Sequence, residues 1–111
     1  VRLVREVASI ADAAGVTLTT EDTLLPLQGI LNGTEDAGVQ AVIQAGRDFQ
    51  RNAPNHRLSS LQDLEAGRPL EIEGTLGYAV RQARQLHQLV PLLDSLYHLA
   101  VAIDRTRVAD R

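Results

Sequence analysis

The chain of 111 residues carries a net charge of −3, and 44% of its residues are hydrophobic, 23% charged and 3% aromatic. This length suits one packed domain and excludes a self-contained two-domain enzyme. Duplex nucleic acid and anionic membranes attract positively charged surfaces, and single strands need aromatic side chains for stacking. The composition therefore argues against nucleic acid and membrane as partners.

Several residue types are missing from the sequence. The lack of Cys excludes disulfides, thiolate metal ligands and a thiol nucleophile. No apolar run reaches the roughly 18 residues of a membrane helix, and acidic Glu6 and Asp12 interrupt any signal-peptide pattern. We expect a cytoplasmic protein. Because the chain starts at Val1 and has neither Met nor Lys, we interpret it as a piece of a longer protein whose lysine chemistry lies elsewhere.

The first elements in chain order are two helices. Apolar residues at three- and four-residue spacing predict a helix over residues 1–14, which Gly15 would end in a left-handed conformation. Residues 19–22 supply two Thr hydroxyls and two carboxylates that would cap a second helix. The apolar stripe of that helix comprises Leu24, Leu27, Ile30 and Leu31.

A third helix follows the Asn32-Gly33 pair. Thr34 would cap it, and it would run to about Gln50. Its expected buried face comprises Val39, Val42, Ile43, Gly46 and Phe49. Residues 52–56 must form a loop because Pro54 cannot continue a helix.

Three more helices are expected in the second half. Ser59 or Ser60 would cap a short helix, with Asp63 in capping-box spacing, and Gly67 would end it. Pro69 would open a long helix reaching His87, with an apolar face of Ile72, Leu76, Ala79, Val80, Ala83 and Leu86. The helix after Pro91 would bury Leu92, Leu93, Leu96, Ala100 and Ile103 and fray from Asp104 onward. With no convincing alternating strand, the predicted fold is all-α, a single multi-helix domain over residues 1–111.

The sequence offers no familiar metal or phosphate motif. His56, His87 and His98 are scattered and form no metal-ligand pair, so we expect no metal. Gly74 and Gly77 lie inside a helical pattern and do not follow a strand, so they are interpreted as packing residues.

Residues 59–73 hold the densest group of polar side chains. They could line a functional site, or they could serve as helix caps and favourable contacts with a helix dipole. The residue pattern alone leaves both interpretations open.

This stretch resembles the C-terminal domain of 2-dehydropantoate 2-reductase, also called ketopantoate reductase. The resemblance rests on Ser59-Ser60-Leu61-Gln62-Asp63, Gly67-Arg68 and Glu71-Ile72. Residues 6–16 and 91–97 also resemble the family, so the likeness covers most of the chain, though weakly over 34–55. It implies a helical fold similar to the C-terminal domain of 6-phosphogluconate dehydrogenase, with the first helix of the domain missing here.

The resemblance implies an enzyme that transfers hydride from NADPH to ketopantoate, a 2-oxo acid, giving pantoate for coenzyme A synthesis. An N-terminal Rossmann domain, absent from this chain, would bind most of the NADPH, and the chain alone would be inactive. Ser60 matches the family's substrate-binding serine and Glu71 its catalytic glutamate, whereas Gln62, Asp63 and Arg68 rank behind them. The family's proton-donating lysine would lie in an earlier helix.

Three positions depart from the family pattern: Leu70, Glu73 and Leu93 stand where Thr, Asp and Asn are usual. The substrate could therefore differ from ketopantoate. The alternative is a non-catalytic helical interaction module, in which two copies pair through Leu92, Leu96, Ala100 and Ile103 as a homodimer.

Overall fold

The computed structural model describes residues 1–19 and 24–109, and these residues form helices and connecting loops without strands. The prediction of an all-α fold is confirmed. Contacts divide the chain into an N-terminal unit, Val1–His56, and a C-terminal unit, Arg57–Arg111. None of the described helices is long and apolar enough to cross a membrane.

The N-terminal unit begins with helix α1, Arg2–Ala13. Gly15 ends it with a φ of +75°, and the Val16 N–H donates to the Ala11 carbonyl across the turn at 2.9 Å. A left-handed residue at this place costs little only when it is Gly, so the predicted end of the helix is confirmed.

Helix α2, Leu27–Asn32, begins later than the sequence pattern indicates. Residues 20–22 of the expected cap lie outside the described residues. The residue before the helix is Pro26, and no side chain caps the first turn. Leu24 precedes the helix and is 75% exposed, so the expected apolar stripe was wrong at this position, whereas Ile30 is fully buried.

Helix α3, Glu35–Asn52, starts where Thr34 accepts a hydrogen bond from the Ala37 N–H at 3.2 Å, as predicted. Its expected buried face was wrong in part, since Val42 and Phe49 are only half-buried. Val39 and Ile43 are 38% and 41% exposed, whereas Gly38 is buried. The helix turns its small residues toward α2, because the absence of large side chains at Gly29 and Gly38 allows the two backbones to approach closely.

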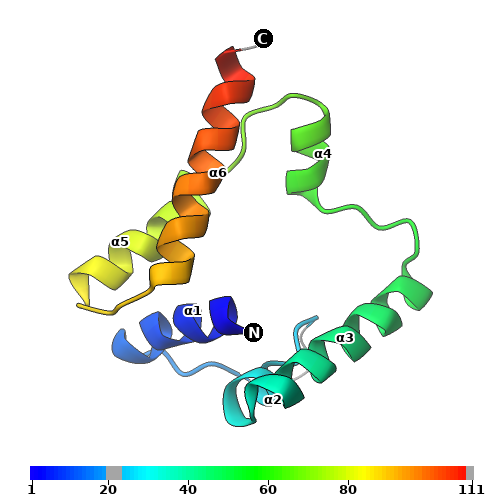
Figure 1. Cartoon of the computed structure of the whole chain (residues 1–111), viewed down its shortest axis with the longest axis vertical. Coiled ribbons are helices and arrows are strands. Elements are labelled where there is room, and N and C mark those ends of the chain that lie inside the picture. The colour runs from blue at the N-terminus through cyan, green and yellow to red at the C-terminus, as the bar shows by residue number, and fades with distance from the viewer. Residues whose placement is uncertain (20–23, 110–111) are drawn as a thin grey trace. The chain divides into compact units, whose positions relative to one another are not determined.

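The C-terminal unit consists of α4, Ser59–Glu65; a π-helical turn η1, Glu73–Gly77; α5, Tyr78–Gln85; and α6, Pro91–Ala109. Figure 1 shows α4 joined to the α5–α6 hairpin by an extended segment. The long helix expected from Pro69 starts only at Glu73, and α6 continues past Asp104 rather than fraying there. Both predicted bounds were wrong.

The α5–α6 hairpin encloses an apolar core. Its buried side chains are Ile72, Val80, Ala83, Val90 and Leu93. Val80 and Leu93 are at most 1% exposed, so α5 and α6 meet through the apolar positions that the helical spacing predicts. Leu92 and Ile103, expected to be buried on α6, are instead 37% and 42% exposed.

Candidate functional site

The predicted site residues all belong to the C-terminal unit. Ser60, Gln62 and Asp63 lie on α4, and Arg68 and Glu71 lie on the segment that connects α4 to η1. Helix α4 has no fully buried residue: Ser60 and Gln62 are exposed, and Asp63 is half-buried.

Ser60 lies in the first turn of α4 and is exposed. The helix has Leu58 at its N-cap position and no side-chain cap, so the predicted capping by Ser59 or Ser60 was wrong. The Gln62 amide donates to the Arg57 carbonyl at 3.3 Å.

Asp63 and Arg68 form an ion pair at the C-terminal end of α4. The Arg68 Nε donates to Asp63 Oδ1 at 2.7 Å. Gly67, with a φ of +69°, reverses the chain there, and the Arg68 N–H donates to the Asp63 carbonyl at 2.9 Å. The pair therefore closes the end of the helix, and the expected capping-box role of Asp63 was wrong.

Glu71 borders a cavity of about 270 Å³ between the connecting segment and α6. The cavity is lined by Leu70, Glu71, Ile72, Glu73, Val101, Asp104 and Arg105. Asp104 fixes the segment, because its Oδ1 accepts a hydrogen bond from the Leu70 N–H at 3.0 Å. Ser60 does not line this cavity, and its role in binding the substrate remains a prediction.

A further cluster beside this cavity joins Glu73, Tyr97 and Arg81. The Tyr97 hydroxyl donates to Glu73 Oε1 at 2.8 Å, and Arg81 Nη1 donates to Glu73 Oε2 at 3.0 Å. Arg81 Nη2 also donates to the Glu73 carbonyl at 2.8 Å. Both carboxylate oxygens of Glu73 and its backbone carbonyl are thus engaged.

The cluster changes the acidity of its members. The hydrogen bond from Tyr97 lowers the pKa of Glu73, and Arg81 and Arg105 add to this effect through their charges. The same hydrogen bond raises the pKa of Tyr97, because the bound hydroxyl must give up its proton beside a carboxylate. At neutral pH the cluster therefore holds an ionised Glu73 and a protonated Tyr97.

The sequence pattern contained only a weak signal for this cluster. Tyr97, Val101 and Asp104 are spaced four and three residues apart and therefore share one face of α6. Tyr97 also ends the stretch over 91–97 that resembles the family. Neither feature reveals that the side chain of Glu73 reaches across to Tyr97.

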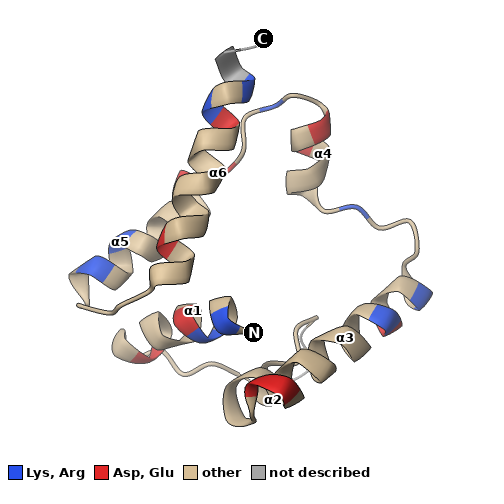
Figure 2. Cartoon of the chain, in the orientation of Figure 1, with Lys and Arg blue, Asp and Glu red and all other residues tan. Residues whose placement is uncertain are grey.

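Charges of both signs surround the Glu71 cavity. Figure 2 shows basic positions on α5 and adjoining acidic and basic positions near the C-terminal end of α6. Glu71, Glu73 and Asp104 contribute three carboxylates to the lining, and Arg105 contributes one cation. The cavity can accept hydrogen bonds from a ligand more readily than it can bind a negative charge.

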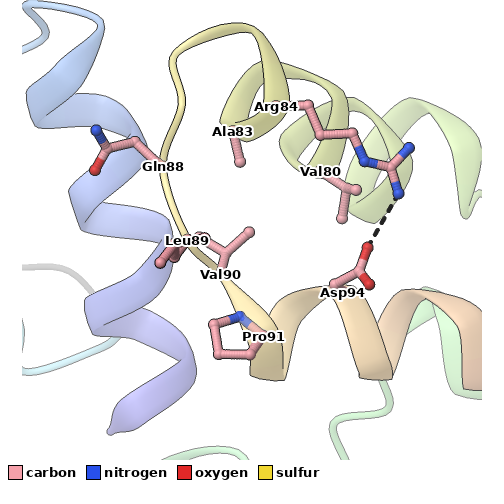
Figure 3. A pocket seen from close by; sticks show the side chains of 8 residues that line it. All are labelled: Val80, Ala83, Arg84, Gln88, Leu89, Val90, Pro91 and Asp94. Atoms are coloured by element: carbon pink, nitrogen blue, oxygen red, sulfur yellow. Dashed lines mark hydrogen bonds and ion pairs between the residues drawn. The ribbon is translucent and has the colours of Figure 1, made fainter.

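A second cavity, of about 340 Å³, lies at the corner between α5 and α6 (Figure 3). Its walls are mainly apolar, and the ion pair between Arg84 Nη2 and Asp94 Oδ1, 3.2 Å apart, stands at one side. None of the predicted site residues lines it.

Within residues 1–19 and 24–109, no group of three His, Asp or Glu side chains could hold a metal ion. His56 lies in the loop between α3 and α4, His87 in the loop between α5 and α6, and His98 on α6.

A comparison with protein families matches residues 1–104 to the family described as ketopantoate reductase PanE/ApbA C terminal. The chain belongs to this family. Membership confirms the resemblance seen in the sequence and indicates an oxidoreductase-type parent protein. Neither the curated proteins nor the solved structures gave a match to the chain.

Proposed function

We propose that this chain is the substrate-side part of a cytoplasmic ketopantoate reductase, which reduces ketopantoate to pantoate with NADPH. The observation that carries the proposal is the family match over residues 1–104. The cavity beside Glu71, in the segment that resembles the family, supports it.

The proposed reaction adds a hydride to the ketone carbon of the substrate, and the carbonyl oxygen takes up a proton. A positioned acid contributes about 100-fold or more to such a step. This chain has no Lys, so the acid would come from another part of the parent protein. Glu71 would orient the substrate toward that acid.

The acidic lining indicates which end of the substrate Glu71 would meet. Ketopantoate has a carboxylate at one end and a hydroxyl at the other. A carboxylate accepts a hydrogen bond from a hydroxyl and repels another carboxylate. Glu71 would therefore accept a hydrogen bond from the hydroxyl end, while Ser60 would donate one to the substrate.

The described residues do not fit a nicotinamide dinucleotide. Such cofactors bind at a glycine-rich turn between a strand and a helix, where the helix N-terminus faces the pyrophosphate. Gly74 and Gly77 instead belong to the π-helical turn η1, and no strand precedes it in the described part of the chain. NADPH would bind to the Rossmann domain of the parent.

The loss of NADPH absorbance on addition of ketopantoate to the intact parent protein tests the proposal. Glu71→Ala should lower kcat/KM by about 100-fold, because the group that orients the substrate toward the acid is lost. Glu65→Ala is the matched control, since Glu65 is an exposed acid of α4 paired with Arg57. If the native parent does not oxidise NADPH with ketopantoate, the proposed reaction is wrong. If Glu71→Ala keeps the native rate, Glu71 has no role in the reaction.

The same assay tests the serine. Ser60→Ala should raise KM about fivefold or more, because it removes one hydrogen bond to the substrate. Ser59→Ala is the comparison, since Ser59 precedes it in the first turn of α4. A larger effect of Ser59→Ala would assign the substrate contact to Ser59 instead of Ser60.

The second candidate is a non-catalytic module in which two copies pair through α6. Leu99 and Ile103 favour it, because they are 56% and 42% exposed on one helix. Light scattering of the purified chain would then give the mass of a dimer, and Ile103→Glu would give that of a monomer. A monomeric native chain would reject this candidate.

A further inference from the structure

Segment 70–77 is attached to one face of α6 on both sides of Glu71. On one side, the Leu70 N–H donates to Asp104 Oδ1 at 3.0 Å. On the other side, the Tyr97 hydroxyl donates to Glu73 Oε1 at 2.8 Å. Tyr97 and Asp104 are two helical turns apart on α6, so Glu71 is held between two fixed points.

The attachment at Glu73 is reinforced within the π-helical turn. Arg81 donates to both the carboxylate and the carbonyl of Glu73, at 3.0 and 2.8 Å. The Thr75 hydroxyl donates to the Glu71 carbonyl and, at 3.3 Å, to the Ile72 carbonyl. These bonds restrict the backbone at Glu71 itself, not only its neighbours.

Gly77 makes the attachment possible. It is buried, and a Cβ atom there would lie 2.7 Å from Glu73 Oε2 and 3.1 Å from Tyr97 Cε2. Any side chain at this position would enter the space in which Glu73 meets Tyr97. The π-helical turn therefore carries its Gly where the Glu73 carboxylate crosses toward α6.

We propose that Glu73 is a positioning residue for Glu71: bound by Tyr97 and Arg81 across Gly77, it fixes on α6 the segment from which Glu71 reaches the substrate. The proposal rests on the proposed function, in which Glu71 contacts the substrate. In this role Glu73 acts through Glu71, because both of its carboxylate oxygens already accept hydrogen bonds from Tyr97 and Arg81. Small displacements of a substrate-orienting group cost large factors in rate, which explains why exposed hydrogen bonds would matter here.

The first experiment measures the attachment without any enzyme activity. Tyr97→Phe in the purified chain removes only the hydroxyl that binds Glu73. Amide hydrogen exchange at Gly77, whose N–H donates to the Ile72 carbonyl at 2.9 Å, should become about fivefold faster. Tyr78→Phe is the matched control, because Tyr78 is 57% exposed and does not belong to the cluster of Glu73, Tyr97 and Arg81. Unchanged exchange in Tyr97→Phe would overturn the proposal.

The second experiment is a double-mutant cycle in the intact parent protein with NADPH and ketopantoate. Tyr97→Phe should lower kcat/KM about tenfold in the native background and less than twofold in the Glu71→Ala background. A merely structural role would give the same factor in both backgrounds and would overturn the proposal.

The two experiments separate the proposals. If exchange at Gly77 responds but the native parent does not oxidise NADPH with ketopantoate, the proposed function fails, and the positioning role fails with it. If the parent is active and Glu71→Ala is impaired, but the factor for Tyr97→Phe does not depend on Glu71, only the positioning role fails.

Discussion

The two units of the chain hold their helices together in different ways. In the N-terminal unit, α2 and α3 approach through Gly29, Gly38 and Ala41, and Arg5 of α1 binds the Ile30 and Gly33 carbonyls at 2.7 and 2.9 Å. In the C-terminal unit, large apolar side chains fill the space between α5 and α6. The first unit combines close backbone contact and polar capping with two buried side chains, Ile10 and Ile30, whereas the second relies on a larger apolar core.

The candidate site belongs to the unit with the larger apolar core. A site residue keeps its geometry when the elements beneath it are held by close packing. Glu71 directly follows Leu70, whose N–H is bound by Asp104 of α6. Helix α6 is itself held in the core by Leu93, which is fully buried.

The largest expected effect tests that core. Leu93→Ala removes a fully buried side chain and should lower the free energy of unfolding by about 2–5 kcal/mol. Leu99→Ala, on the same helix but 56% exposed, should change it by less than about 0.5 kcal/mol. Urea denaturation measures both values, and equal effects would show that the hairpin core does not hold the C-terminal unit.

The next effect compares a glycine from each unit. Gly77→Ala should destabilise the chain by up to about 1 kcal/mol, because its Cβ, 2.7 Å from Glu73 Oε2, would displace the Glu73 carboxylate from its bonds to Tyr97 and Arg81. Gly46→Ala on α3 should stabilise it by about 0.5–1 kcal/mol, since nothing lies within 4 Å and Ala favours a helix. Thermal unfolding shows whether each substitution raises or lowers the stability. Stabilisation by Gly77→Ala would contradict the close packing at η1.

A smaller effect tests the polar capping of the N-terminal unit. Arg5→Ala should cost about 1 kcal/mol, because two carbonyls at the end of α2 lose a charged donor. Arg2→Ala removes an exposed ion pair with Glu35 and should cost less than about 0.5 kcal/mol. Amide exchange in α2 distinguishes them, and an equal response to both changes would reject the capping role.

The smallest effect concerns the acidity of Tyr97. In Tyr78→Phe, Tyr97 is the remaining tyrosine, and its phenolate absorbance should titrate with a pKa above the ordinary value of 10.0. Adding Glu73→Ala should return the pKa toward that value, since the bond to Glu73 is the main cause of the shift. The stability from this bond is complete between about pH 4.5 and pH 10, the ordinary pKa values of Glu and Tyr. It is lost as the pH rises through the raised pKa of Tyr97 or falls through the lowered pKa of Glu73. Identical titration curves would place Tyr97 outside the cluster.

Local signals predicted many ends of the helices. Gly15 and Gly67 end helices in left-handed conformations, and Thr34 caps α3, because these effects depend on a few neighbouring residues. The bound at Pro69 was wrong: the segment after Pro69 is bound to α6 through the Leu70 N–H and Asp104, and the π-helical turn begins only at Glu73.

The candidate site was predictable only in part. The spacing of Ser60 and Glu71 supported the family resemblance, which the comparison confirmed over residues 1–104. The pairing of Asp63 with Arg68 and of Glu73 with Tyr97 was missed, because the first depends on a turn and the second on the packing of two helices.

The sequence by itself determined the all-α class, the main apolar face of the α5–α6 hairpin and the family, since helical periodicity and motif order are properties of the chain. Only the tertiary structure decided which face α3 buries, where the π-helical turn begins and which side chains meet at Glu73. Those outcomes depend on how closely two backbones can approach, and that distance is set jointly by residues far apart in the sequence.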